Sequence, residues 1–447
     1  MKNNYKDDYL IREKPLNALI VFSLPIIIGN LFQQAYTMAD SAIVGRYVSE
    51  QALAAVGASY SLTNIFICIA MGGGIGASVI VSRYFGEKDY SKMKLAVFTS
   101  FISFLTLSIL LGGIGLLFSK RIMILMNTPI DVLDMAVQYL NIYFLGLPFL
   151  FMYNVLSSMF NALGKSKIPL YFLIFSSVFN VILDFILVTR FQMGVAGVAW
   201  ATLIAQGISA SLSFLFFMKE LKILNCRHTK AFDKTELLSM TKIAMPSILQ
   251  QSTVSIGMML VQSVINRFGY QTLAGFSAAM RVESICVVPM MGIGNAVSSY
   301  TAQNIGTHKE ERVIEGYHVA NKIVIVFAIV ICLMLEFFHS QIISLFLAEG
   351  TATAVSTGRN YLTFMGWFFC LIGFKMTVDG LLRGAGDMKM FTIANLVNLF
   401  IRVSLSVAFA PKYGIAMVWY AVPIGWFANW IISFLQYRTG KWKAIYS

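Results

Sequence analysis

Residues 23–57 read SLPIIIGNLFQQAYTMADSAIVGRYVSEQALAAVG, and this stretch decides the fold. Most of it is apolar enough to lie in lipid, yet Asn30, Gln33, Thr37 and Asp40 recur at helical spacing and therefore share one face. A carboxylate at membrane depth costs about 2.5–3.5 kcal/mol on insertion scales. A chain keeps such a residue where it faces a partner or a water-filled cavity, so we expect a membrane helix with Asp40 on its functional face.

The composition indicates that most of the chain lies in a bilayer. Of its 447 residues 57% are hydrophobic and only 12% are charged, whereas soluble proteins carry about 25% charged residues. The apolar runs are long, which favours an all-α polytopic bundle over an outer-membrane barrel. The net charge of +13 sits in short loops, where it indicates topology and not a nucleic-acid partner.

The ends and the cysteines point away from a secreted, disulfide-linked protein. Residues 1–15 are charged, and the helix that follows contains Asn30 and Asp40, so we expect no cleavable signal peptide. The five cysteines are widely spaced, none has the spacing of zinc ligands, and we expect free thiols.

The apolar runs predict twelve transmembrane helices, most of them longer than the roughly 20 residues needed to cross a bilayer. The expected spans are residues 16–44, 52–81, 93–118, 133–163, 168–190, 194–218, 237–266, 272–302, 316–347, 354–382, 388–410 and 414–437. Most of the 34 Lys and Arg fall in the loops that face the cytoplasm if the N-terminus is inside. This bias predicts a multi-pass protein of the cell inner (plasma) membrane with both termini in the cytoplasm.

The chain repeats itself at an offset of about 220 residues. The matching segments are Pro25 with Pro246, QALAAVG at 51–57 with QTLAGFS at 271–277, Gly72 with Gly292, NALGKSK at 161–167 with RGAGDMK at 383–389, and GVAGVAW at 194–200 with GIAMVWY at 414–420. Because each half has six spans, both halves have the same orientation, so the repeat is parallel. We expect an N-terminal six-helix bundle over residues 1–218, a cytoplasmic linker over 219–236 and a C-terminal six-helix bundle over 237–447.

The N-terminal half contains a second buried carboxylate. In span five, Asn180 and Asp184 share one helical face, and hydroxyl or amide oxygens of Thr202, Asn154 and Ser157 lie on neighbouring spans. Two carboxylates with such oxygens can form a hard-oxygen site for Na⁺ or hold a shared proton. The Ser and Thr residues equally suit simple helix pairing.

The C-terminal half has a different set of intramembrane charges, and Val261 stands at the counterpart of Asp40. These charges are Arg281, Glu283, Lys375, Asp379 and Arg402. Lys375 and Asp379 are spaced i, i+4 and can form an ion pair, which is either structural or a substrate contact. Arg281 and Glu283 do not face each other, so each is expected to have a partner on another helix. We therefore place ion coupling in the N-terminal half.

Polar residues on the first and seventh spans predict a substrate cavity. The expected lining residues are Asn30, Gln33, Gln34, Thr37, Gln251, Ser255, Gln262 and Asp379. Met and aromatic side chains, abundant in this chain, adapt to varied ligands, although most of them are expected to pack or to face lipid.

The chain resembles the multidrug and toxic compound extrusion (MATE) transporters over nearly its whole length. The resemblance is carried by Leu24, Pro25, Asp40, Val44 and Gly45, the ALAAVG tail, RGAGD at Arg383–Asp387, and N-x-x-x-D at Asn180–Asp184. The last motif with Asp40 is similar to the DinF-like branch. NorM-like members place a coupling Glu in span seven, where this chain has Val254, while Asp379 matches the family's acidic position in span ten.

This resemblance implies cation-driven efflux of amphipathic organic cations coupled to H⁺ or Na⁺, with no other cofactor. It implies a first-half ion network of Asp40, Asn180, Asp184 and Thr202, with Ser157 where some relatives have Asn. We expect a secondary multidrug antiporter that works by alternating access as a monomer. The alternative is a flippase for a lipid-linked precursor. The four histidines lie in or near loops and no P-loop is present, so we do not expect an enzyme.

Overall fold

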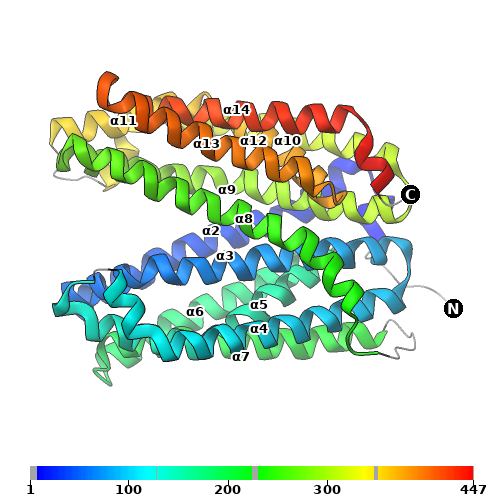
Figure 1. The fold of residues 1–447 in the computed structure, drawn as a ribbon, viewed down its shortest axis with the longest axis horizontal. Helices are drawn as coiled ribbons and strands as arrows, with labels where there is room; N and C mark the ends of the chain where they lie inside the picture. The colour runs from blue at the N-terminus through cyan, green and yellow to red at the C-terminus, as the bar shows by residue number, and fades with distance from the viewer. Residues whose placement is uncertain (1–7, 127, 224–229, 347–350, 446–447) are drawn as a thin grey trace. The chain divides into compact units, whose positions relative to one another are not determined.

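A computed structural model describes residues 8–126, 128–223, 230–346 and 351–445, and within these ranges the ordered elements are all helices (Figure 1). The elements are α1 (Tyr9–Arg12), α2 (Pro15–Tyr47), α3 (Glu50–Glu87), α4 (Tyr90–Leu125), α5 (Ile130–Ala162), α6 (Lys167–Thr189), α7 (Gly194–Ile223), α8 (Lys234–Ile265), η2 (Asn266–Phe268), α9 (Tyr270–Gly306), α10 (Glu310–Phe346), α11 (Ala352–Gly366), α12 (Phe369–Gly384), α13 (Met388–Tyr413), α14 (Ala416–Arg438) and η3 (Lys441–Ile445).

The helices are long and apolar enough for a polytopic membrane protein. In the described part of the chain, ten helices qualify as membrane spans by length and composition, and the bent pair α11 and α12 makes an eleventh if it counts as one span. Helix α8 covers the seventh expected range, so every expected span coincides with a helix or a helix pair. The longest, α3, has 38 residues. At about 1.5 Å per residue it exceeds the roughly 30 Å hydrocarbon core, so its ends extend past the lipid or it is tilted.

The tenth expected span, residues 354–382, is not one continuous helix. It breaks after Gly366, and α12 leaves α11 at a bend of 54°. At the break the N–H of Phe368 donates to the carbonyl of Met365 at 2.9 Å, three residues back instead of four. Glycine is a weak helix former, and this tighter turn interrupts the regular ladder where α11 ends. Hydrophobic periodicity did not predict the break because both pieces are apolar.

The chain forms two compact units whose limits differ from the expected halves. One unit comprises residues 28–248, which we call the N-unit, and the other comprises residues 1–27 and 249–447, which we call the C-unit. The chain therefore passes between units inside α2 and α8, just after Pro25 and Pro246, and not at the linker of residues 219–236. Residues 224–229 of that linker lie outside the described part.

Specific contacts explain why the first turns of α2 and α8 belong to the opposite repeat. The short helix α1 buries Leu10 in the C-unit, where the Asn304 amide donates to the Leu10 carbonyl at 3.1 Å. In the N-unit the hydroxyl of Tyr84 donates to Glu236 at the start of α8, at 2.8 Å. The start of α2 therefore belongs to the C-unit, and the start of α8 belongs to the N-unit.

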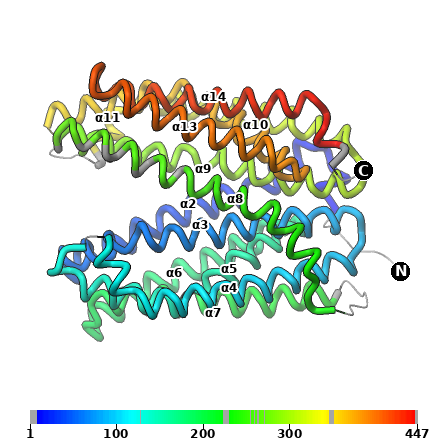
Figure 2. The backbone as a smooth tube through the Cα atoms, viewed as in Figure 1, coloured from blue at the N-terminus to red at the C-terminus, as the bar shows by residue number. Residues whose placement is uncertain are grey.

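The two units share one packing scheme, as the internal repeat predicts. In the N-unit α3 packs on α5, α5 on α7, and α6 on α7. The equivalent helices of the C-unit pack in the same pairs, α9 on α12, α12 on α14, and α13 on α14. Within each unit the long helices run alongside one another (Figures 1 and 2). The central helix of each scheme is α5 in the N-unit and α12 in the C-unit.

The cysteines fit the expectation of free thiols where they are described. Cys68 and Cys286 are buried and Cys332 and Cys370 are partly buried, and none of these four described cysteines is in a disulfide. Cys226 lies outside the described residues.

Candidate functional site

The carboxyl groups of Asp40 and Asp184 come together inside the N-unit. Asp40 lies on α2 and is partly buried, whereas Asp184 lies on α6 and is fully buried. The two side chains are within hydrogen-bonding distance of each other. Two carboxylates this close cannot both stay ionised without a cation between them. The pair therefore needs either a shared proton or a bound cation.

Asn180 and Thr202 surround this pair from α6 and α7. When the Asn180 amide nitrogen faces Asp184 it donates to Oδ2 at 3.1 Å, and the amide oxygen then accepts from the Thr202 hydroxyl at 3.3 Å. This orientation is the one that satisfies both donor and acceptor. The other carboxyl oxygens, Oδ1 of Asp40 and Oδ1 of Asp184, are buried without a hydrogen-bond partner. Unpartnered anionic oxygens in an apolar interior are suited to receive a cation.

Three tyrosines that the sequence reasoning missed complete the site. Tyr36 on α2 shares a hydrogen bond with Thr202 and lies close to Asp40. Tyr139 on α5 is close to both carboxyl groups, and Tyr143 follows it by one turn. Tyr36 precedes Asp40 by four residues, so helical spacing alone could have identified it.

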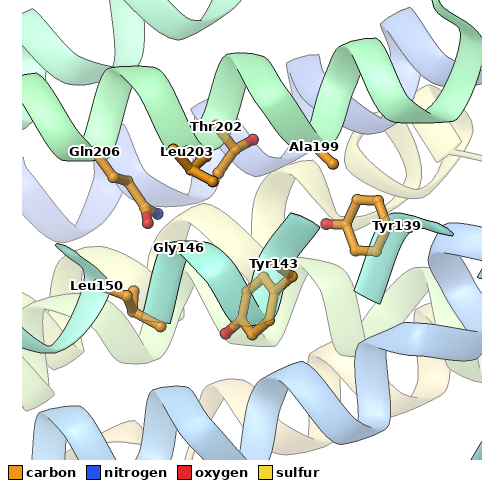
Figure 3. A pocket seen from close by; sticks show the side chains of 8 residues that line it. All are labelled: Tyr139, Tyr143, Gly146, Leu150, Ala199, Thr202, Leu203 and Gln206. Carbon is orange, nitrogen blue, oxygen red and sulfur yellow. The ribbon is translucent and has the colours of Figure 1, made fainter. Parts of the chain in front are cut away.

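A small cavity continues from these tyrosines between α5 and α7 (Figure 3). It is lined by Tyr139, Tyr143, Gly146, Leu150, Ala199, Thr202, Leu203 and Gln206. The Tyr139 hydroxyl, the Thr202 hydroxyl and the Gln206 amide give it polar groups among apolar walls (Figure 3). It has room for about one water molecule. Thr202 thus belongs both to the carboxyl network and to this cavity.

The other N-unit residues of the predicted site lie outside this network. The Asn154 amide donates to the Leu150 carbonyl of its own helix at 2.9 Å, and Ser157 is partly buried one turn further along α5. On α2 the Thr37 hydroxyl donates to the Gln33 carbonyl at 2.9 Å, and both of these side chains are exposed. Asn30 and Gln34 are partly exposed.

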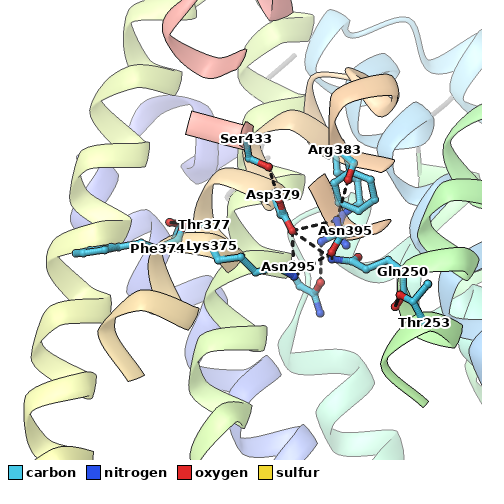
Figure 4. A network of polar contacts seen from close by, with 11 residues as sticks. Gln250, Thr253, Asn295, Phe374, Lys375, Thr377, Asp379, Arg383, Asn395 and Ser433 are labelled. Carbon is cyan, nitrogen blue, oxygen red and sulfur yellow. Dashed lines mark hydrogen bonds and ion pairs between the residues drawn. The ribbon is translucent and has the colours of Figure 1, made fainter. Parts of the chain in front are cut away.

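In the C-unit the predicted pair of Lys375 and Asp379 is the centre of a buried polar network (Figure 4). Lys375 Nζ lies 3.1 Å from Asp379 Oδ2. Asn395 on α13, Gln250 on α8 and Ser433 on α14 also donate to the Asp379 carboxylate. The sequence reasoning did not include these three partners because they lie on other helices, and helical spacing relates only residues of one helix.

Two glycines bring α12 against α9 beside this network. A Cβ atom on Gly380 would lie 2.2 Å from the carbonyl oxygen of Gly294, and one on Gly294 would lie 2.7 Å from the carbonyl oxygen of Met376. Only glycine permits the two backbones to approach this closely. Asp379, the neighbour of Gly380, is consequently held at a tightly packed crossing.

The remaining C-unit charges are dispersed. Glu283 is buried and accepts a hydrogen bond from the Tyr361 hydroxyl on another helix, with Arg402 near both. Arg402 itself is partly buried, and its Nε has no hydrogen-bond partner. Arg281 is exposed. Glu283 thus has the expected partner on a neighbouring helix.

The α8 residues of the predicted cavity belong to the C-unit. Gln251 and Ser255 are partly buried. The side chain of Gln262 lies outside what the structure describes.

Comparison with known proteins identifies the family. The sequence matches the MatE family over residues 25–186 and 246–408, one match in each half. This chain belongs to the MATE family. The first match contains Asp40, Asn180 and Asp184, and the second contains Lys375 and Asp379, whereas Thr202 lies outside both. MATE-family membership makes the chain a membrane transporter and not an enzyme.

Relatives in the MATE family cover the chain almost end to end. It is 32% identical over 432 residues to the probable multidrug resistance protein YpnP of Bacillus subtilis, with 96% of each chain covered. It is 26% identical to the multidrug export protein MepA of Staphylococcus haemolyticus, covering 86% of this chain and 85% of MepA. The expected DinF-like branch remains a prediction.

Solved structures agree with the MATE fold. The outward-facing structure of a multidrug resistance MATE family transporter superimposes with a TM-score of 0.91 at 24% identity, covering 98% of this chain and 99% of that one. A transporter of the MOP superfamily from Pyrococcus furiosus gives a TM-score of 0.91 at 23% identity, with 99% of each chain covered. At this level of identity the likeness shows the fold alone.

Proposed function

We propose that this MATE-family chain is a secondary multidrug efflux antiporter of the cell inner (plasma) membrane. It exports amphipathic organic cations in exchange for H⁺ or Na⁺. The observation that carries the proposal is the contact between the Asp40 and Asp184 carboxyl groups. The relatives YpnP, a probable multidrug resistance protein, and MepA, a multidrug export protein, support the same function.

The ion step follows from the geometry of this pair. A proton or Na⁺ removes the repulsion between the two carboxylates, and Asn180 and Thr202 supply neutral oxygens and an amide donor around them. Without the ion, the pair carries excess negative charge in an apolar interior, which favours any conformation that brings water or another cation to it. An organic cation is such a partner, so binding of the drug and of the ion compete.

The direction of exchange needs two conformations that favour different ligands. A ligand shifts a conformational equilibrium only by its difference in affinity for the two states. We propose that the coupling ion favours one state and the organic cation the other, which produces alternating access with both termini in the cytoplasm. The chain contains both repeats and is proposed to act as a monomer in contact with membrane lipids.

Transport from proteoliposomes tests this function. Wild type and the Asp40→Asn variant are loaded with a fluorescent cationic dye, and efflux is followed under an imposed Na⁺ gradient and, separately, an imposed pH gradient. We expect one gradient to drive wild type and neither to drive the variant, because an amide at position 40 cannot exchange a cation. The matched control is Asp131→Asn, which neutralises an exposed carboxylate at the start of α5.

Two outcomes would contradict the proposal. Gradient-driven efflux by Asp40→Asn at the wild-type rate would remove Asp40 from the coupling step. Failure of both gradients to drive dye in wild type would favour the alternative, a flippase for a lipid-linked precursor, and a lipid-linked substrate would then replace the dye.

A further inference from the structure

Three charged residues form a buried stripe along one face of α12. Lys375, Asp379 and Arg383 follow one another at four-residue spacing, which places them on the same side of the helix (Figure 4). All three side chains are buried. Ionised side chains are rare in an apolar interior unless they are paired, so the stripe requires a local explanation.

The carboxylate of Asp379 accepts from four groups of the chain itself. Its Oδ2 faces Lys375 Nζ at 3.1 Å and accepts from Asn395 at 3.3 Å and Gln250 at 3.4 Å. Its Oδ1 accepts from the Ser433 hydroxyl at 2.9 Å. A carboxylate offers about four acceptor positions. Four donors from four helices therefore surround the carboxylate, and Oδ2, which faces three of them, has no position left for a further cation.

Lys375 is itself held in place by a second acceptor. Its ammonium group donates to the Asn395 Oδ1 at 3.1 Å, while the Asn395 amide nitrogen donates to Asp379. Asn395 thus bridges the two charges of the pair. This arrangement fixes the ammonium group against the carboxylate in the way that a bound cation would be fixed.

The third charge of the stripe adds a positive surplus. Arg383 donates to Asn295 Oδ1 at 2.8 Å and to the Ser298 hydroxyl at 3.3 Å. Both partners are neutral, and no carboxylate among the described residues lies within ion-pair distance of Arg383. The stripe therefore has two positive charges for one negative charge. That surplus opposes the entry of another cation because charges interact strongly in a low dielectric.

The carboxyl pair of the N-unit has the opposite character. Oδ1 of Asp40 and Oδ1 of Asp184 have no hydrogen-bond partner. Within the described part of the chain, neither carboxyl group has a basic side chain at ion-pair distance. One unit thus presents carboxylates open to a cation, and the other presents a carboxylate already neutralised.

We propose that Lys375 is a tethered cation that fills the carboxylate site of the C-unit and so determines that only the N-unit exchanges a coupling ion. The proposal rests on the antiport function given above. It adds that Lys375 limits ion exchange to the site in the N-unit. It makes Lys375 a specificity-determining residue, because an uncharged side chain at that position converts Asp379 into a second site for H⁺ or a small cation.

Labelling with a hydrophobic carbodiimide tests the proposal in the purified full-length protein. Carbodiimides modify protonated carboxyl groups and spare ionised ones, and peptide mass spectrometry quantifies each aspartate separately. In wild type we expect Asp379 to remain unmodified. In Lys375→Met we expect modification of Asp379 to rise about tenfold or more, because an opposite charge at this distance strongly favours the ionised form. Lys375→Arg, which keeps the charge, is the matched control and is expected to behave as wild type.

A chemical rescue tests whether the place of Lys375 accepts a free cation. In Lys375→Ala, n-butylammonium ions are expected to protect Asp379 from the carbodiimide, whereas butan-1-ol, of similar size and uncharged, is not. Wild type is expected to show no effect of either. Where Lys375→Met fails to give a monodisperse protein on gel filtration, Lys375→Gln takes its place with the same expected rise, since it keeps a donor but no charge.

Two results would overturn the proposal. One is modification of Asp379 in wild type to the same extent as in Lys375→Met. The other is absence of modification in Lys375→Met or Lys375→Gln. Asp40 and Asp184 are measured in the same samples. If neither Na⁺ nor a change of pH alters their labelling, the proposed antiport function fails, and this outcome is distinct from any result at Asp379.

Discussion

The side-chain amide of Asn180 lies 3.3 Å from the hydroxyl of Thr202, and this contact joins α6 to α7 beside the carboxyl pair. Among the described residues, the Thr202 hydroxyl bonds to Asn180 and not to Asp184. It acts through Asn180, whose amide nitrogen faces Asp184 Oδ2 at 3.1 Å when its oxygen faces Thr202. Thr202 is therefore a positioning residue for the proposed ion site.

Replacement of Thr202 by valine is expected to weaken ion coupling without abolishing it. Valine has nearly the same shape but no hydroxyl, so it loses the hydroxyl hydrogen bonds to Asn180 and Tyr36 and keeps only the backbone N–H that donates to the Asn180 oxygen at 3.1 Å. A hydrogen bond between neutral groups contributes about 0.5–1.5 kcal/mol, so the half-saturating concentration of the coupling ion should rise roughly two- to tenfold. Dye efflux at varied Na⁺ concentration or pH measures this half-saturating concentration.

Controls separate positioning by Thr202 from general damage to the fold. Thr202→Ser keeps the hydroxyl and should behave as wild type. Thr106→Val changes an exposed threonine on α4 and should have no effect. An unchanged ion affinity with a reduced maximal rate in Thr202→Val would contradict the positioning role.

Because α9 and α12 pack closely, we expect a single methyl group added at Gly380 to lower the stability of the protein strongly. Gly380→Ala would place its Cβ atom 2.2 Å from the Gly294 carbonyl oxygen, and backbone atoms cannot move aside easily. We expect a loss of roughly 1–3 kcal/mol or more in the free energy of unfolding, the usual cost of overpacking. The yield of monodisperse protein and the apparent melting temperature in detergent measure this loss.

The matched control for that prediction is Gly113→Ala on α4. A Cβ atom there meets nothing within 4 Å, and alanine is the better helix former. This variant should be neutral or slightly more stable. Equal stability of Gly380→Ala and wild type would show that α9 and α12 do not need this close approach.

The start of α8 has a cap that depends on pH. Asp233 Oδ1 accepts from the backbone N–H of Thr235 at 2.7 Å and of Glu236 at 3.3 Å. These hydrogen bonds lower the pKa of the Asp233 carboxyl below its ordinary value. The cap therefore stabilises the first turn of α8 fully above the ordinary aspartate pKa of about 3.9, and this stabilisation is lost as pH falls through the lower folded pKa.

Hydrogen–deuterium exchange measures this loss. After correction for the intrinsic pH dependence of exchange, the amides of Thr235 and Glu236 should lose protection only in that acidic range. Asp233→Asn keeps an acceptor oxygen without a titrating group, so its protection should not change there. A loss of protection in wild type between pH 5 and 7 would assign the cap to another group, since this lies above the range about an aspartate pKa.

The sequence predicted the membrane class and the positions of the helices because both depend on local apolar length. It also placed Asn180 one turn before Asp184 and Lys375 one turn before Asp379, since helical spacing is a property of a single element. It missed the break between Gly366 and Phe369. The sequence also placed the boundary between the units at the linker of residues 219–236. The structure places it inside α2 and α8, because Leu10 and Glu236 contact helices that are distant in the chain, and such contacts leave no local sequence pattern.

The sequence by itself determined that this chain is an all-helical MATE-family membrane protein with two repeats and buried charges in each. Only the tertiary structure decided what those charges face. Asp40 meets Asp184, and one oxygen of each has no hydrogen-bond partner, whereas both oxygens of Asp379 have donors, among them Lys375, Asn395 and Ser433. The physical reason is that spacing fixes the face of one helix, while the charge state of a buried carboxylate depends on donors that other helices bring to it.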